Sequence, residues 1–444
     1  MTIFTKRLLL FILTLFLTIL IAALLINIFE RKQEAKLKYL KIVDIPENEL
    51  DPKVWKQNFP REYDSYIKTQ NTKELVKYSK WGRYGGSENF SKLDKFPDLK
   101  RMFAGYAFAV EYNEERGHMY SLTDSLSSQR LGDKKPAACI HCHSGGIFQV
   151  IDAIGEEKFY SSLALDIVKE HNVKHPIVCA DCHHPETMDL RVTRKKFKEA
   201  MERRGIDITQ ATRHQMRTYV CAQCHVEYYF KGPNKLLTYP WDKGLEVDNI
   251  EAYYDGIQFA DWTHAETKAP MIKVQHPEFE LWSTGIHARS GVTCSDCHMP
   301  YVREGAVKVT DHWVRTPLAN ITNACLTCHR QTEEEMKSRV LEIQDKTYSL
   351  LTRAEKAILS AMDAIKEAMA AGATDEDLKD ARSLHRKALI RWDFVSAENS
   401  MGFHSPQEAA RILGDSIDYA RQSEIAAYQV LTQRKETQLK LSRE

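Results

Sequence analysis

The sequence predicts a mainly α-helical fold with little β structure and with long helices near the C-terminal end. No stretch alternates apolar and polar residues for long enough to build a large sheet. Residues 332–371 are rich in helix-forming residues and carry apolar side chains at helical spacing. The cysteines fall in short repeats, separated by segments typical of loops and short helices. These observations divide the chain into residues 1–30, 31–330 and 331–444.

Residues 1–30 predict a membrane segment. Lys6 and Arg7 precede an uncharged apolar run from Leu8 to Ile28. As a helix this run of about 21 residues is roughly 30 Å long, enough to cross a bilayer. It ends without an Ala-x-Ala-like site, which favours an anchor through residues 8–28 over a cleaved signal peptide. Either segment places the rest of the chain in the periplasm or on the extracytoplasmic side of the membrane.

The next part of the chain, residues 31–105, has mixed charge and scattered aromatic residues. We expect short helices and loops that wrap around the cysteine-rich part, with aromatic contacts from Trp55, Tyr63, Tyr66 and Trp81. The formal net charge of the 444-residue chain is +1, so no nucleic-acid partner is indicated.

Five Cys-x-x-Cys-His motifs use all ten cysteines of the chain. They comprise Cys139, Cys142 and His143; Cys179, Cys182 and His183; Cys221, Cys224 and His225; Cys294, Cys297 and His298; and Cys325, Cys328 and His329. This spacing lets two thiols form thioethers with one haem while the adjacent histidine binds the iron. A zinc site needs Cys-x-x-Cys motifs in pairs and no histidine directly after them, and disulfides would not explain five such histidines. The sequence therefore predicts five haems c, whose apolar surface would form much of the core. Their propionates, roughly two negative charges per haem, would make the loaded protein acidic.

Residues 226–275 form a long insertion between the third and fourth motifs, rich in Tyr, Lys and Pro. We expect an irregular stretch, and a long irregular stretch inside a compact domain is usually functional.

Residues 331–444 predict three long helices. The first runs from Thr332 to Ala371, stops at Gly372 and carries one apolar stripe, at Leu351, Ala354, Ile358, Ala361 and Ile365. Thr374 with Asp377 resembles a capping box for the second helix. Ser405, Pro406 and Glu408 form a stronger start for the third, which we expect to run nearly to the end. The stripe indicates either a packed bundle or a self-association interface.

Three stretches near the motifs combine charged and proton-donating side chains. They are Gly117–Arg130, Glu227-Tyr228 and Lys273–Glu278. Each stretch alone is weak evidence of a substrate site. An arginine near a haem usually binds a propionate, and a lone tyrosine is usually part of the core. A protein that only transfers electrons through five histidine-ligated haems needs ten axial ligands, and the chain has 17 histidines. The number of histidines therefore does not distinguish an electron-transfer protein from an enzyme.

At these residues the sequence resembles the pentahaem cytochrome c nitrite reductases that form ammonia. The resemblance extends from roughly Tyr106 to Pro406, with order and spacing kept. The matching residues are Gly117-His118-x-Tyr120, Asp124 with Arg130, Glu227-Tyr228, Lys273-x-Gln275-His276, His287, Thr310-Asp311-His312, Arg391-Trp392-Asp393 and His404-Ser405-Pro406.

The resemblance implies an oxidoreductase that reduces nitrite to ammonium with six electrons at the first haem, while four further haems relay electrons. It implies Arg130, Tyr228 and His276 around the substrate. It also implies distal ligands for the other haems: His118 for the third, His312 for the second, His287 for the fifth and His404 for the fourth.

The same resemblance implies one calcium ion, a homodimer through the C-terminal helices, and a quinol-oxidising membrane cytochrome as electron donor. The calcium ligands would be the side chains of Glu227 and Gln275 and the carbonyls of Tyr228 and Lys273. The residues suit this chemistry, since reduction of an anion needs positive charge and proton donors, and calcium prefers oxygen ligands.

The sequence departs from the family at His143, where most members have lysine. Either imidazole serves as the proximal ligand of a variant reductase, or the first haem has two histidines, the second being His141 or an unassigned one such as His264. The joint retention of Arg130, Tyr228 and His276 favours the reductase.

Two other function classes stay open. One is a membrane-tethered electron-transfer cytochrome without a substrate site. The other is a hydroxylamine-oxidising enzyme, for which the sequence has no additional cross-linking signature. A nitrite reductase would also be expected to reduce hydroxylamine, and sulfite is a further candidate substrate at the same site.

Overall fold

The predicted mainly helical fold with little β structure is confirmed. A computed structural model of the protein describes residues 3–34, 41–71, 90–113, 116–305 and 307–441. Within these residues the strands form three two-stranded antiparallel sheets, and helices make up most of the remainder. Trp81 lies outside the described residues, so the expectation for residues 31–105 applies only to the rest of that segment.

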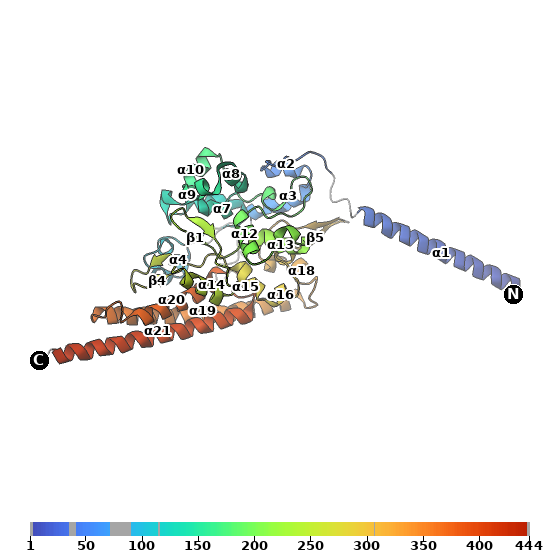
Figure 1. Cartoon of the computed structure of the whole chain (residues 1–444). Helices are drawn as coiled ribbons and strands as arrows, with labels where there is room; N and C mark the ends of the chain where they lie inside the picture. The colour runs from blue at the N-terminus through green and yellow to red at the C-terminus, as the bar shows by residue number, and fades with distance from the viewer. Residues whose placement is uncertain (1–2, 35–40, 72–89, 114–115, 306, 442–444) are drawn as a thin grey trace.

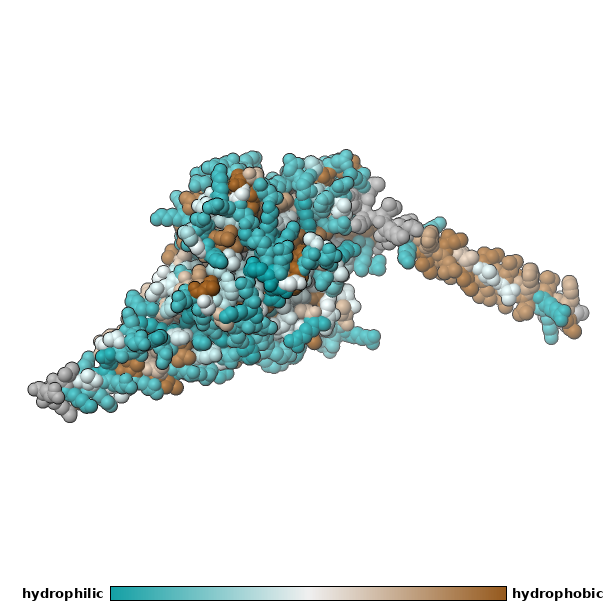
Figure 2. All heavy atoms as spheres, viewed as in Figure 1, coloured by the Kyte–Doolittle hydropathy of each residue, from teal (hydrophilic) through white to brown (hydrophobic). Residues whose placement is uncertain are grey.

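Helix α1 (Ile3–Glu34) stands away from the body of the molecule (Figure 1). The most apolar 18-residue window of its span Ile3–Glu30 has a mean hydropathy of 3.1, and none of that window is buried. Figure 2 shows hydrophobic residues along its visible length. The helix is long and apolar enough to cross a bilayer, and a signal sequence at the N-terminus would have the same character.

Short helices follow before the first motif. They are α2 (Pro52–Lys56), α3 (Pro60–Ile67), α4 (Lys92–Lys95) and α5 (Leu99–Met102). Asp51 starts α2 by accepting a hydrogen bond from Lys53 N at 2.9 Å. Trp55 and Phe59 pack with Val178 and Ala180 beside the second motif, so this segment lies against the cysteine-rich part of the chain.

The cysteine-rich part is built from short helices joined by loops. They are α6 (Ser121–Ser127), α7 (Ile140–His143), α8 (Ile147–Ile154), α9 (Glu156–Ser161), α10 (Ala164–Glu170), α11 (Cys179–Cys182), α12 (Lys195–Arg203), α13 (Arg213–Ala222), α14 (Val247–Gly256), α15 (Glu278–Ser283), α16 (Ile286–Arg289), α17 (Cys294–His298) and α18 (Ile321–Ala324). The hairpins are β1 (Tyr229–Lys231) with β2 (Leu236–Thr238), β3 (Trp262–Thr263) with β4 (Pro270–Met271), and β5 (Tyr301–Glu304) with β6 (Val307–Thr310).

The expectation of an irregular stretch at residues 226–275 is correct only for the loops of that segment. The segment holds two of the hairpins and α14. Its aromatic residues explain why it is ordered, because Tyr229 packs against Tyr254 and Phe259, with ring centres 5.4 and 4.7 Å apart.

Three long helices lie side by side at the C-terminal end: α19 (Glu333–Ala370), α20 (Lys379–Ala397) and α21 (Pro406–Leu441) (Figure 1). Thr332 and Glu335 form a capping box at the start of α19. The predicted box of Thr374 and Asp377 also forms, but it closes a turn and α20 begins only at Lys379.

The apolar stripe of α19 is buried within the chain. Leu351, Ala354, Ile358, Ala361 and Ile365 are at most 3% exposed. All of them except Ala361 pack in two apolar clusters that also include residues of α20 and α21. The stripe is therefore explained by the bundle, and it no longer argues for an interface between two copies of the chain.

Candidate functional site

Each cysteine motif includes or follows a short helical turn. Residues three apart are neighbours on a helix surface, so a turn brings the two sulfur atoms of a motif to one side. The aspartate inside two of the motifs closes the turn: Asp181 accepts from Val178 N at 2.9 Å, and Asp296 accepts from Thr293 N at 2.8 Å. All ten cysteines lie in the described part of the chain, and none of them forms a disulfide there.

Four motif histidines face a second histidine from a distant part of the chain. The ring centres are 6.1 Å apart for His118 and His225, 6.1 Å for His183 and His312, 6.3 Å for His287 and His329, and 6.2 Å for His298 and His404. These are the four combinations that the family resemblance implies for the second to fifth haems.

The spacing of the rings fits one metal between each pair. An imidazole nitrogen binds a metal at about 2 Å and lies about 1.1 Å from the centre of its ring, so two axial rings have centres about 6 Å apart. Aromatic rings in ordinary stacked or edge-to-face contact have similar distances between their centres, so the spacing of one pair alone is weak evidence of a metal between the rings. Four pairs with this spacing, each containing one motif histidine, fit haem ligation. The ligand assignment itself stays a prediction.

Several of these rings are oriented through their second nitrogen. Nδ1 contacts a backbone carbonyl in His183 (Met188 O, 3.1 Å), His298 (Arg315 O, 3.0 Å) and His312 (Thr310 O, 2.9 Å). A proton on Nδ1 would make this contact a hydrogen bond and leave Nε2 as the metal-binding atom.

The first motif differs from the other four. The four partner histidines already face the motif histidines of the other motifs, so none of them is left for His143. Ser121 Oγ donates to the His143 carbonyl at 2.8 Å, which links the motif to α6.

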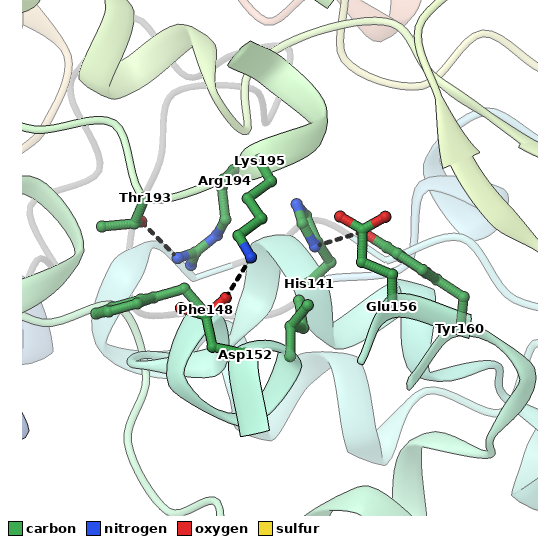
Figure 3. A pocket seen from close by; sticks show the side chains of 9 residues that line it. His141, Phe148, Asp152, Glu156, Tyr160, Thr193, Arg194 and Lys195 are labelled. Carbon is green, nitrogen blue, oxygen red and sulfur yellow. Dashed lines mark hydrogen bonds and ion pairs between the residues drawn. The ribbon is translucent and has the colours of Figure 1, made fainter. Parts of the chain in front are cut away.

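Each alternative ligand for the first haem contacts other protein groups through at least one ring nitrogen, while His141 Nε2 has no hydrogen-bond partner among the described residues. His264 Nε2 lies 2.9 Å from Arg101 O, and its ring packs on His385 at 5.5 Å. His141 Nδ1 lies 3.0 Å from the hydroxyl of Tyr160 (Figure 3). Both histidines are at most 1% exposed.

A small pocket borders His141 on the side of α8 and α9 (Figure 3). Its volume of about 10 Å³ holds roughly one water molecule. The buried Arg194 on its wall pairs with Asp181 at 2.9 Å and donates to Ser144 O at 3.1 Å. Arg194 therefore connects the first motif to the second. With room for about one water molecule, the pocket is too small for a substrate site.

Arg130 is fixed near the first motif by neutral groups. Its Nε donates to Ser128 Oγ at 3.1 Å, and its guanidinium lies 4.5 Å from the ring centre of Phe108. Among the described residues its two terminal nitrogens have no hydrogen-bond partner. They are free to hold an anion.

Tyr228 lies within electrostatic reach of both Arg130 and the first motif. Burial raises the pKa of Tyr228, the nearby Cys142 and Cys139 add to the shift, and Arg130 opposes it. His276 belongs to a neighbouring segment, because Gln275 N donates to Glu227 Oε2 at 2.5 Å. The residues adjacent to this bonded pair, Tyr228 and His276, are thereby brought to the same region.

Three of the residues proposed to bind calcium, Glu227, Lys273 and Gln275, are linked by hydrogen bonds. Glu227 is fully buried, and its carboxylate accepts from Gln275 N and from the hydroxyl of Tyr254 at 2.8 Å. The side chain of Gln275 lies 3.0 Å from the Lys273 carbonyl. Hydrogen bonds thus link Glu227, Gln275 and the Lys273 carbonyl in one segment, and carboxylate, amide and carbonyl oxygens are the ligands that calcium prefers.

Helix α20 contacts the segment Lys273–Gln275 through the matched stretch Arg391-Trp392-Asp393. Asp393 pairs with the Lys273 ammonium at 2.9 Å and accepts from Val274 N at 2.9 Å, and both charged side chains are 1% exposed. Arg391 pairs with Glu251 of α14 at 2.9 Å. Helix α20 therefore fixes the segment that carries Gln275 and His276.

Two buried carboxylates near these groups escaped the sequence analysis. Glu280 accepts from Glu227 N and from Trp241 Nε1, both at 2.8 Å, and burial raises its pKa to about 8. Glu398 lies 2.5 Å from His404 Nδ1. The only signal in the sequence is their nearness to His276 and His404, and nearness does not show where a side chain points.

The chain is similar to known proteins in both sequence and fold. The sequence profile of the cytochrome c552 family matches residues 51–442. A cytochrome c-552 from Parabacteroides distasonis is 43% identical over 85% of this chain and 76% of its own length. One from Porphyromonas gingivalis is 40% identical over 91% of this chain and 82% of its own length.

A solved structure has the same fold. It is a cytochrome c nitrite reductase from Desulfovibrio desulfuricans, a catalytic subunit with two calcium sites. Its TM-score is 0.81 at 35% identity, over 87% of this chain and 88% of that one. The protein belongs to the cytochrome c552 family and is a multihaem cytochrome of the nitrite-reductase type.

Proposed function

We propose that this protein is a dissimilatory nitrite reductase that forms ammonium at the first motif. The reaction is NO₂⁻ + 8 H⁺ + 6 e⁻ → NH₄⁺ + 2 H₂O. One observation carries the proposal: each of the four partner histidines faces a histidine of the second to fifth motifs. The first motif is instead near Arg130 and Tyr228.

The cysteines and histidines of the motifs would hold five haems c, with His118, His287, His312 and His404 as further ligands. A bound haem supplies an iron that exchanges one electron at a time, and the first would also offer a coordination position to the substrate. His143 would be its only protein ligand.

The remaining chemistry belongs to side chains of this protein. Arg130 would bind the oxygens of nitrite with its terminal nitrogens, in the geometry that guanidinium groups favour for oxyanions. The Tyr228 hydroxyl would donate to an oxygen of the substrate. His276 would deliver protons, because imidazole exchanges protons readily near neutral pH.

A calcium ion would be held by the side chains of Glu227 and Gln275 and by the carbonyls of Lys273 and Tyr228. Its charge would attract the anion. The segment that carries His276 would then be fixed from two sides, by these donors and by the pair of Lys273 with Asp393.

The proposal includes an assignment for each part of the chain. Residues 1–30, and within them residues 8–28, would anchor the protein on the extracytoplasmic face of the membrane or direct it to the periplasm. Residues 31–330 would hold the haems, and residues 331–444 would form a homodimer. A quinol-oxidising membrane cytochrome would supply the electrons.

The direct test is a steady-state assay with reduced viologen as donor and nitrite as acceptor, scored for ammonium. We expect ammonium to form with six electrons consumed per nitrite. If a preparation with five attached haems forms no ammonium and all five are low-spin, the alternative of an electron-transfer cytochrome without a substrate site is correct.

A further inference from the structure

The second nitrogens of the paired histidines meet two kinds of partner. His183 and His312, the pair of the second motif, both contact backbone carbonyls. In the pair of the fourth motif, His298 contacts a carbonyl, but His404 faces the carboxylate of Glu398. In the pair of the third motif, His225 faces the carboxylate of Glu278 at 3.8 Å.

Glu398 is built into the protein interior. Its residue is fully buried, and its Oε1 lies 2.5 Å from His404 Nδ1. The two atoms are at ion-pair distance without the alignment of a good hydrogen bond, and Nδ1 has no other partner. Ser400 binds the same carboxylate through its Oγ at 2.7 Å and its N at 3.2 Å, and Ser400 Oγ also accepts from His404 N at 2.9 Å.

The two carboxylates belong to one cluster. Asn399, the neighbour of Glu398, donates to Glu278 Oε1 at 2.5 Å. Close packing holds the surrounding backbone, because a Cβ at Gly285 would overlap the carbonyl oxygen of His404. The carboxylates therefore lie beside the third and fourth motifs through a fixed geometry and not through mobile surface side chains.

We propose that Glu398 is a positioning residue that lowers the reduction potential of the fourth haem through His404, and that Glu278 does the same more weakly for the third haem through His225. This rests on the ligand pairs of the proposed function. A carboxylate beside the second nitrogen makes an imidazole ligand more basic, and a more basic ligand favours the ferric iron. A neutral carbonyl does so less, and the field of a charge is strong in a buried site.

The chain thus sets an order of potentials. The third and fourth haems are shifted downward relative to the second, whose two ligands contact only carbonyls. The difference in distance, 2.5 Å against 3.8 Å, makes the shift at the fourth haem the larger one.

The test is a redox titration of the full-length protein followed by electron spin resonance, which resolves individual low-spin haems. In Glu398→Gln the side chain keeps its size and loses its charge. At the potential where the wild-type fourth haem is half reduced, we expect the ratio of reduced to oxidised haem to rise about tenfold. That ratio corresponds to about 59 mV for one electron. The signal of the second haem should not move.

Three further variants keep the result interpretable. Glu398→Asp retains the charge and should retain most of the low potential. Glu278→Gln should raise the midpoint potential of the third haem by a smaller amount. If Glu398→Gln fails to assemble, this variant still tests whether a buried carboxylate lowers the potential. Glu342→Gln, on the exposed face of α19, should change nothing.

Failures of the two proposals are distinguishable. If the wild-type protein contains fewer than four low-spin haems, the proposed ligand pairs are wrong, and the proposed function that depends on them is wrong too. If it contains four, and both glutamine variants leave every midpoint in place, the carboxylates are structural and only this inference is overturned.

Discussion

Arg130 keeps its charge available because its contacts are neutral. Ser128 and Phe108 fix its Nε and the face of its guanidinium, and neither removes the positive charge. The carboxylate of nearby Glu111 is engaged by Ser128 Oγ at 2.8 Å and by Gln129 N. An arginine that only neutralised a carboxylate would be paired with it directly.

Arg130→Ala should reduce kcat/KM for nitrite while all five haems stay attached. A charge-assisted hydrogen bond contributes about 1.5–3 kcal/mol, which corresponds to a loss of about ten- to 150-fold. The measurement is turnover at limiting nitrite. Arg339→Ala is a suitable control, because Arg339 makes only an exposed pair with Glu342. Wild-type turnover in Arg130→Ala would mean that Arg130 binds no substrate.

His143→Lys should keep nitrite reduction, since lysine fills this position in most of the enzymes that the chain resembles. In the oxidised wild-type protein one haem should be high-spin, because His143 would be its only protein ligand, and four should be low-spin. His143→Ala should lose activity or lose the haem. Spin resonance with and without cyanide decides: five low-spin haems insensitive to cyanide would contradict an open site.

The haem motifs could be predicted from the sequence because attachment chemistry fixes the spacing of Cys142 and His143 from Cys139. The pairing of distant histidines could be expected only through the family resemblance, since nothing in the sequence brings His118 toward His225. The carboxylates of Glu280 and Glu398 were beyond prediction, because whether a glutamate is buried depends on packing from several elements.

At the scale of elements, the segment Lys273–Gln275 is fixed between α20 and the turn after the third motif. Asp393 holds one side and Glu227 the other. A Glu227→Ala, Gln275→Ala double variant should lower nitrite turnover by loosening Tyr228 and His276, and chelation of calcium should act in the same direction. The measurement is activity together with bound calcium. A fully active protein without metal after chelation would contradict the calcium site and leave the nitrite proposal intact.

The loop between β3 and β4 is tied to the helical layer through Glu266. Its carboxylate binds Arg101 of α5 at 2.9 Å and Lys366 of α19 at 2.8 Å. Burial opposes ionisation, but these bonds outweigh it and lower the pKa of Glu266 to about 2. The pair of contacts therefore stabilises the fold above pH 4.5, the ordinary pKa of glutamate, and this contribution is lost as the pH falls toward about 2.

Glu266→Gln should accordingly destabilise the protein near neutral pH by about 1 kcal/mol, a value reduced because the pair is partly solvent-exposed. The difference from wild type should shrink below pH 4.5 and vanish near pH 2. Thermal unfolding measured across this range tests it. Glu376→Gln, which removes an exposed pair with Lys379 at 3.7 Å, should show no such dependence. A constant difference at all pH values would assign the effect of Glu266→Gln to packing.

The long helices illustrate what local sequence determines. Thr332, Gly372 and Pro406 mark helix ends through local backbone chemistry, so the bounds of α19 and the start of α21 could be predicted closely. The partner of the apolar stripe on α19 could not, because periodicity identifies a buried face without identifying what buries it. The stripe packs within the chain.

At the scale of the whole molecule, α21 extends past the body as a single helix (Figure 1). One face of its distal half packs inward, where Ala427 and Leu431 join an apolar cluster. Ile425, Tyr428 and Leu439 lie elsewhere on its surface and are 58%, 42% and 54% exposed. Their spacing of three and fourteen residues places them along one side of the helix.

Exposed apolar residues in a row on a projecting helix suit contact with the same row of a second copy. Such a contact would be isologous, because the same surface serves both partners. We expect a homodimer at micromolar concentration, measured by light scattering on detergent-solubilised protein or on a chain that begins after Phe29. Replacing Ile425 and Tyr428 together by Glu should shift the mass to that of a monomer, since charges would be buried without partners. Ile257→Glu, at an exposed apolar residue of the body, should leave the dimer intact. A wild-type monomer would exclude the interface, and a dimer that survives the double replacement would place it on another surface.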